Sequence, residues 1–415
     1  FMIGPLFLLN GVSLQNIFFG LLLGNLMAVL SWRYLCAPIA TKARLTLYYH
    51  LEKIAGEKLV KVYNLANGIL FCFLAGAMIT VSATAVGIPF NVPMPAIEDS
   101  YPNSLSFVVI VIAVGAVIAV VASLGYDMVA KFANIAAPWM VVVFLACGII
   151  SFKQLGVSGW TELNELWTAS IVFAQKGQGT STMGFWSVVL FAWFCNAAMH
   201  IGMSDLSVFR FAKKASYGWA SAAGMYIGHY MAWIAAAFML AAQIKLSQDA
   251  NPVPGPMASN VAGLAGIICV IVAGWTTANP TIYRAGLAFQ AIVPSASRFK
   301  VTLIAGSVAT IAGVFPAFAW KLLGFVGIYG TILAPIGAVI FFDWHFRCKG
   351  NADTLHNTVP SSPFNLSVLF AWLIPVGIAL YFIQAIGITP WIFPLPCWIV
   401  CGVLYILFNR KSLVA

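Results

Sequence analysis

Long apolar runs, one after another and each about twenty residues in length, constrain this chain more than any other feature of its sequence. Only 8% of the 415 residues are charged, and 62% are hydrophobic. A soluble domain carries roughly 25% charged residues, so most of the surface of this protein must face lipid. In lipid the backbone polar groups have to bond within the chain, as a helix or a closed barrel. Because a barrel needs alternating apolar and polar residues, the continuous runs predict an all-α membrane protein.

The apolar runs predict about twelve transmembrane helices. The chain opens inside an apolar half-span at 1–10 with no basic leader before it, so we expect a first helix that is truncated at its N-terminus. The eleven full spans are expected near 14–35, 63–87, 104–124, 128–151, 183–204, 218–244, 261–283, 301–316, 319–342, 366–387 and 391–408.

The positive residues fall on alternate loops of this map. If the second span ends in the cytoplasm, 17 of the 21 Lys and Arg residues are cytoplasmic. The four on the other side are Lys153, Lys176, Lys245 and Lys321. The positive-inside rule then places both termini in the cytoplasm, in a plasma or inner membrane. Basic residues that are spread over loops, and not along one stripe, argue against a nucleic acid polymer as partner.

Two loops are expected to carry helices that do not cross the membrane. The inner loop has an amphipathic stretch from Arg44 to Lys58, which we expect to lie along the inner membrane surface. The outer loop at 152–182 is long and holds Trp160, Leu163, Leu166 and Trp167, which is consistent with a surface helix there.

The second and seventh spans share a pattern. Gly20–Leu30 reads GLLLGNLMAVL and Gly224–Ile234 reads GMYIGHYMAWI, so that Gly, Gly, Met and Ala match at a shift of 204 residues. Five spans separate the two, so the copies cross the membrane in opposite directions, as in the inverted repeats of secondary transporters. The alternative is a pair of unrelated small-residue packing motifs. The predicted division is a first repeat at 1–151, a second at 183–345 and two additional C-terminal helices at 366–408.

Four segments resemble one known family. They are GVSLQNIFFGLLLGNLMAVL at 11–30, DLSVFRFA at 205–212, WTTANPTIYRAGL at 275–287 and PIGAVIFFD at 335–343. In this order they are similar to motifs of the nucleobase–cation symporters, the purine and cytosine permeases. The resemblance implies a five-plus-five inverted repeat of the LeuT type. It also implies cation-coupled symport, by alternating access, of nucleobases or related nitrogen heterocycles with sodium or protons.

The resemblance also implies a sodium site on the eighth helix. The hydroxyls of Thr276 and Thr277 and the carbonyl of Ala273 would bind the ion, together with helix-one carbonyls from about Phe1 to Gly4. Oxygen ligands suit a hard cation, and neutral ones suffice for a monovalent ion. The alternative is that the threonines bond back to their own helix. Na⁺ or H⁺ is the expected coupling ion, and no other cofactor is expected.

Trp193, Phe194 and Asn196 are the first candidates for substrate binding, since they lie where the sixth helix should unwind. Aromatic faces and an amide suit a flat heterocycle, although packing or lipid contact is an alternative for the two aromatic residues. Asn279 precedes Pro280, which frees nearby backbone, so this amide would bind substrate or cap the freed carbonyls.

The third helix departs from the family pattern, which offers a Gln and a stacking Trp toward the nucleobase. The matching stretch here is NGILFCFLAG, in which Asn67 would donate a hydrogen bond and Phe71 or Phe73 would stack. Ala273 stands where the family usually has an amide, so the expected site is less polar than a cytosine site. The substrate class therefore stays open, and another small solute such as an amino acid, an amine or a vitamin is the main alternative.

The remaining polar residues of the spans have interpretations that do not require transport chemistry. His200 and His229 would carry a proton or, more simply, donate a hydrogen bond between helices. Three acids at inner span ends, Asp205, Asp127 and Asp343, are expected to pair with Arg210, Lys131 and Arg347 respectively.

A channel, an enzyme and a transporter-like sensor are the alternatives to a transporter. A channel would need a filter or a charged ring, and an enzyme would need a cluster of catalytic groups. The sequence shows neither, so we predict that the protein is not an enzyme. A transporter-like sensor stays open. The expected partners are a small-molecule substrate and the lipid bilayer, and the expected assembly is a monomer or a weak homo-oligomer.

Overall fold

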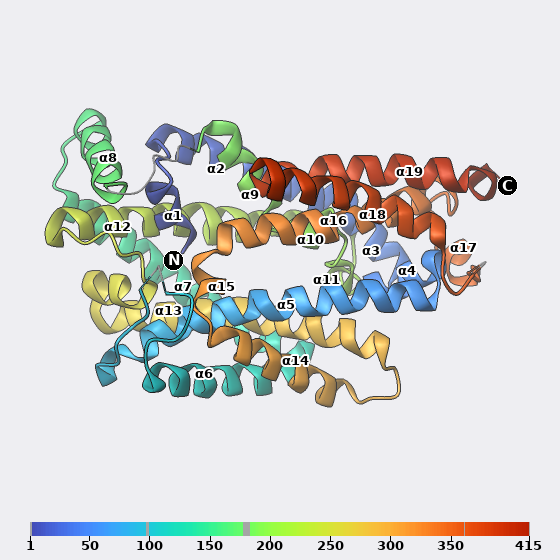
Figure 1. The fold of residues 1–415 in the computed structure, drawn as a ribbon, viewed down its shortest axis with the longest axis horizontal. Coiled ribbons are helices and arrows are strands. Elements are labelled where there is room, and N and C mark those ends of the chain that lie inside the picture. The colour runs from blue at the N-terminus through green and yellow to red at the C-terminus, as the bar shows by residue number, and fades with distance from the viewer. Residues whose placement is uncertain (1, 97–98, 177–182, 361, 415) are drawn as a thin grey trace.

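The long helices run side by side along one axis in the computed structural model (Figure 1). The structure describes residues 2–96, 99–176, 183–360 and 362–414. Helices make up 81% of the structure, and no strand occurs in those residues. The prediction of an all-α architecture is therefore confirmed.

Eight helical segments of the described residues are long and apolar enough to cross a membrane. They comprise α2 (Leu14–Ser31) continuing into α3 (Ala37–Ala43), α5 (Glu57–Val86), α6 (Leu105–Ser123), α7 (Tyr126–Leu155), α12 (Ala232–Ser247) with the π-helix Ala223–Met231 before it, α13 (Pro254–Ile292), α16 (Leu322–Phe346) and α18 (Leu366–Tyr381). The other four expected spans correspond to shorter or interrupted helices. These are α1 (Ile3–Leu9), α9 (Phe185–Phe194), α14 (Arg298–Gly313) and α19 (Pro394–Val414). The count of twelve spans stays a prediction.

Surface helices cover the two ends of the long axis. α4 (Leu47–Ala55) and α17 (Ala352–Asn357) lie toward the end where the C-terminus is, and α8 (Trp160–Ala174) lies at the opposite end (Figure 1). The positive charges of the sequence assign these same two groups to opposite sides of the membrane. The orientation of the termini itself stays a prediction.

The predicted amphipathic and outer-loop helices are both present, as α4 and α8. α4 begins after Thr46, whose side chain accepts a hydrogen bond from the Tyr49 amide. Its apolar face is buried against α5, α16 and α18, so α4 closes one end of the helix bundle.

Two helix pairs that the shift of 204 residues would superpose pack against one another. α5 forms the most extensive helix pair of the structure with α13, and α2 packs against the π-helix Ala223–Met231. In the same order along the chain, α6 after α5 packs along α14 after α13, although the shift of 204 residues does not align this pair. Two copies related by a two-fold axis make such contacts between equivalent elements. The pairing supports the predicted inverted repeat.

Small residues set the closest helix approaches. A Cβ at Gly337 on α16 would lie 1.7 Å from the carbonyl oxygen of Ile201, whereas a Cβ at Gly324 on the same helix would meet nothing within 4 Å. Position 337 thus needs a glycine, because the backbone at Ile201 approaches α16 closely there, and position 324 does not.

We expect Gly337→Ala to destabilise the protein by about 1–3 kcal/mol, because α16 must move away from Ile201. Gly324→Ala is the matched control on the same helix, and it should leave stability unchanged or raise it slightly through helix propensity. Thermal unfolding of the two variants in detergent measures this difference. Equal melting temperatures would contradict the packing at Gly337.

His50 of α4 provides a test that depends on pH. Its ring is fully buried beside Trp344, at 6.1 Å between ring centroids, and neither ring nitrogen has a hydrogen-bond partner. Burial lowers the pKa of His50 from 6.5 to about 4. The unfolded chain therefore binds more protons between these values, and the stability that His50 provides above pH 6.5 is lost as the pH falls toward 4.

The free energy of unfolding of His50→Phe should depend less steeply on pH in this window. Over the whole range the variant should lose up to about 3 kcal/mol less stability than wild type. Chemical unfolding between pH 4 and 7 measures the slope. His345→Phe, which replaces an exposed imidazole, should keep the wild-type slope. If His50→Phe and wild type lose stability in parallel, the ring titrates without linkage to folding.

Candidate functional site

The centre of the molecule contains an interrupted helix. α9 ends at Phe194, and α10 (Ala197–His200) begins after Asn196, whose backbone is not helical. The prediction that the chain unwinds at this point is confirmed. The interruption frees the carbonyl of Trp193, which lies 2.8 Å from His200 Nε2 and accepts its N–H. His200 is thus occupied in stabilising the break.

A cavity of about 670 Å³ lies beside the interruption. Its walls come from α1, α5, α7, α9, α10, α13 and the π-helix Ala223–Met231. Most of the lining is apolar, and five methionines contribute to it. The polar and charged lining residues are Asn196, Asp205, Ser221, His229, Thr276, Thr277, Thr281 and Arg284. The volume and this mixture of residues are typical of a site for a small molecule.

Oxygen atoms cluster on the α13 wall of the cavity. The hydroxyls of Thr276 and Thr277 donate to the carbonyl oxygen of Ala273 at 3.0 and 3.2 Å, so both threonines bond back to their own helix, as the alternative interpretation of the sequence predicts. Pro280 has no N–H to donate to the carbonyl of Thr276 one turn earlier, so that oxygen is also released from the helix. Each hydroxyl that donates to Ala273 keeps its lone pairs. These neutral oxygens therefore fit a small hard cation.

The described residues contain no group of three or more His, Cys, Asp or Glu side chains that could hold a metal ion.

Four of the predicted site residues line the cavity: Asn196, Ala273, Thr276 and Thr277. Of the predicted helix-one ligands, Met2 and Ile3 line it as well, whereas Gly4 packs against the backbone of Trp233, and Phe1 lies outside the described residues. The sequence therefore predicted one polar group on the interrupted helix and the oxygen cluster that faces the same cavity.

The other predicted substrate residues lie behind the cavity walls. Trp193 and Phe194 stack on each other at 4.5 Å between centroids, and the Trp193 indole N–H donates to the Ser31 hydroxyl. Asn67 donates to the Tyr48 hydroxyl, and Phe71 packs against a tyrosine of α16. Their part in binding substrate stays a prediction.

Asn279 is fully buried off the cavity, and neither atom of its amide has a hydrogen-bond partner. The predicted capping of freed carbonyls by this amide is not seen. Its part in substrate binding likewise stays a prediction.

An ion pair closes one end of the cavity. Asp205, after α10, binds Arg284 of α13 at 2.6 Å and accepts the Trp32 indole N–H at 2.8 Å. The expected pairing of Asp205 with Arg210 is wrong. α13 brings the Arg284 side chain to the buried carboxylate, whereas the Arg210 guanidinium lies over the Phe211 ring.

The expected pair of Asp343 with Arg347 is confirmed, at 2.6 Å. Sequence reasoning found this pair because its members are four residues apart on one helix. It missed Arg284, Trp32 and Trp233 as cavity residues, because no short-range pattern marks contacts between distant helices.

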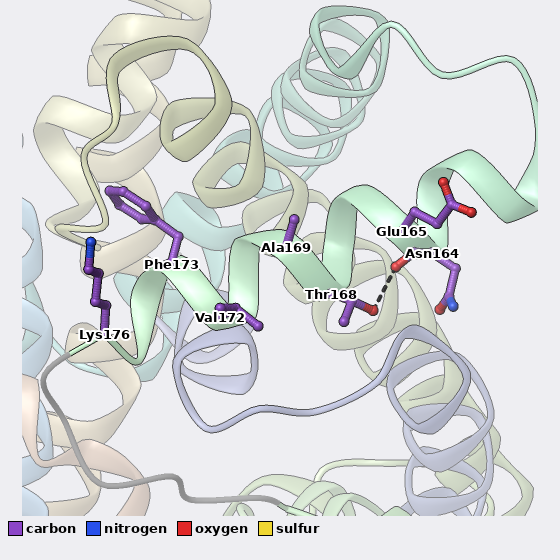
Figure 2. A pocket seen from close by; sticks show the side chains of 7 residues that line it. All are labelled: Asn164, Glu165, Thr168, Ala169, Val172, Phe173 and Lys176. Atoms are coloured by element: carbon purple, nitrogen blue, oxygen red, sulfur yellow. Dashed lines mark hydrogen bonds between the residues drawn. The ribbon is translucent and has the colours of Figure 1, made fainter.

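A second hollow, of about 790 Å³, lies along the outer helix α8 (Figure 2). Its lining residues all come from positions 164–176, so it is one face of one helix and cannot enclose a ligand. The cavity at the interrupted helix is therefore the candidate site.

Comparison with known proteins gives a fold and no close relative. No protein-family model matches the chain, and no curated protein matches it. Several solved structures have the same fold. Mhp1, a nucleobase-cation-symport-1 family transporter, in a closed conformation with bromovinylhydantoin bound, has a TM-score of 0.72 at 15% identity, covering 99% of this chain and 88% of that one.

Two further solved structures agree. The inward-facing conformation of Mhp1 has a TM-score of 0.67 at 16% identity, covering 98% of this chain and 87% of that one. A substrate-bound, outward-open Na⁺-coupled sialic acid symporter has a TM-score of 0.67 at 13% identity, covering 99% and 86%. The chain has the fold of these transporters, and these neighbours are not enzymes.

We expect Arg284→Gln to destabilise the protein by about 3–5 kcal/mol, because it leaves the buried Asp205 carboxylate without its counter-charge. Adding Asp205→Asn should restore much of the loss. The control is Glu57→Gln, which removes the exposed ion pair with Lys61 and should change nothing. Thermal unfolding measures all three. An Arg284→Gln variant as stable as Glu57→Gln would show that the ion pair does not hold the end of the cavity together.

Proposed function

We propose that the chain is a nucleobase–cation symporter that carries a neutral nitrogen heterocycle and a sodium ion by alternating access. The observation that supports this most strongly is a single cavity, in which an amide on an interrupted helix and an oxygen cluster on α13 are both exposed. In secondary transporters, discontinuous helices at a repeat interface form the substrate and ion sites. The fold shared with Mhp1 and with a Na⁺-coupled symporter is consistent with this arrangement.

The charges of the cavity favour a neutral substrate. Its charged lining residues are Asp205 and Arg284, and they neutralise each other. A free carboxylate or ammonium on the substrate would need an opposite charge in this low-dielectric space. An amino acid or amine is therefore a poorer fit than an uncharged heterocycle.

The same oxygens suggest how the ion and the substrate are coupled. An ion at Thr276, Thr277 and Ala273 would lie on the α13 wall, and the Asn196 amide lines the same cavity. If ion binding fixes this wall, it raises substrate affinity, and substrate must then raise ion affinity by the same factor.

Several related predictions complete the proposal. The helices form two inverted repeats and two additional C-terminal helices, about twelve spans in all. The protein lies in a plasma or inner membrane with both termini on the cytoplasmic side. It works as a monomer or weak homo-oligomer. The packing of α5 on α13 and of α6 on α14 supports the repeat.

The proposal predicts sodium-dependent stabilisation by a heterocycle. Hydantoin, uracil, cytosine and hypoxanthine, each in sodium and in potassium, should be compared by the thermal shift of the purified full-length protein. At least one should raise the melting temperature more in sodium than in potassium. Thr277→Ala should lose this difference, because it removes one oxygen from the cluster.

Thr168→Ala is the matched control. The Thr168 hydroxyl makes the same bond to the carbonyl four residues earlier, at 2.8 Å, but it lies on α8 (Figure 2). Thr168 does not line the cavity at the interrupted helix. This variant should keep the sodium effect. If only an amino acid stabilises the protein, the proposed heterocycle substrate is wrong. If a heterocycle binds equally well in sodium and in potassium, the proposed ion site is wrong. Uptake into proteoliposomes separates a transporter from a sensor.

A further inference from the structure

The two copies of the repeated pattern treat their central polar residue differently. Asn25 and His229 occupy the same position at the shift of 204 residues. Asn25 lies in the regular helix α2, is fully buried, and donates to the carbonyl of Met225 at 3.0 Å. His229 is half-buried and lines the cavity. Equivalent positions thus have a structural amide in one copy and an imidazole facing the cavity in the other.

A change of helix type accompanies this difference. Residues 223–231 form a π-helix, whereas the matching residues of α2 are α-helical. π-helical turns are rare and occur frequently at functional sites, because the wider turn redirects side chains. Here the π-helix presents Gly224, Gly228 and His229 to the cavity.

The His229 ring is held on one face, and its edge has only a weak hydrogen-bond partner among the described residues. It stacks on Trp233 at 4.4 Å between centroids and 14° between planes. Its Nδ1 lies 3.9 Å from the Cys195 sulfur, and a thiol is a weak hydrogen-bond partner. Packing fixes the plane of the ring, while the part of the chain that the structure describes offers its nitrogens little to bond.

Asn196 lies beside the same sulfur and is in the same situation. Within the described residues the hydrogen-bond contacts of its Nδ2 are to two sulfur atoms, Cys195 Sγ at 3.6 Å and Met225 Sδ at 4.0 Å. Polar groups in the middle of a membrane protein are costly unless they are bonded, and they commonly mark a substrate pathway. Asn196 and His229 thus share one weak partner, the Cys195 sulfur. Both remain available to hydrogen-bond with the polar edge of a ligand in the cavity.

We propose that His229, with Asn196, binds the polar edge of the transported molecule and that His229 determines its specificity. This inference rests on the proposed function and deepens it. A neutral imidazole offers one donor and one acceptor, and an amide offers both kinds as well. The ligand class that matches is a neutral cyclic amide, in which a ring N–H lies next to a carbonyl.

The test is binding of hydantoin and uracil, and of their N-methylated forms, to the full-length protein in sodium. His229→Phe keeps a ring to stack on Trp233 but has no nitrogen, and it should bind the N–H forms about tenfold more weakly or worse. It should also lose the preference over the N-methylated forms. His229→Gln supplies a donor and an acceptor again and should recover part of both effects.

A purely structural role predicts the opposite order, with His229→Phe tolerated and His229→Gln impaired, and that order would overturn the inference. Tyr230→Phe, the neighbouring position of the same π-helix, is the control and should bind as wild type does. If His229→Phe binds normally while Thr277→Ala still abolishes the sodium effect, the inference fails and the proposed function stands. If wild type binds none of the probes, both fail.

Discussion

The structure depends on one constraint, which is that every backbone polar group inside the hydrocarbon region must be bonded within the protein. An interrupted helix violates this constraint unless other groups supply the missing bonds. At Cys195 and Asn196 the chain does so locally. The Trp193 carbonyl accepts from His200, and the turn after α10 is closed by amides that bond back to Ala197 and Ala198. The break can therefore expose a polar wall to the cavity without leaving its backbone unpaired.

The same break is connected to α13 by a chain of specific contacts. The His200 ring packs against Trp32 at 4.8 Å, and Trp32 donates to Asp205, which binds Arg284. The Tyr48 hydroxyl in turn donates to the Arg284 carbonyl. Buried ion pairs contribute little net stability but are costly to split, so they favour two alternative arrangements over a continuum. A movement of α13 relative to the interrupted helix would have to separate this pair, which makes it the natural place for a change between two states.

The two copies of the repeated sequence pattern meet beside the cavity. The Tyr226 hydroxyl donates to the carbonyl of Leu22, and these residues are 204 apart, the shift between the two copies. Copies related by a two-fold axis make such contacts between equivalent residues near the axis. The copies differ in helix type, since α2 uses its polar residue Asn25 for packing and the π-helix directs His229 into the cavity.

The sequence by itself determined the class of protein and the approximate helices, because lipid solvation and backbone hydrogen bonding can be evaluated from runs of neighbouring residues. The interruption of the sixth span was predicted from the expected transporter architecture and not from its local sequence. The sequence also placed Thr276, Thr277 and Ala273 together, since they lie within one turn of one helix. Only the tertiary structure decided which residues meet from different helices. Asp205 binds Arg284, 79 residues away, in place of Arg210. Trp193 and Asn279 lie off the cavity, because helix packing sets the rotation of each helix. The change at His229 from α- to π-helix depends in the same way on the helices around it, so the pattern shared with α2 could not reveal it.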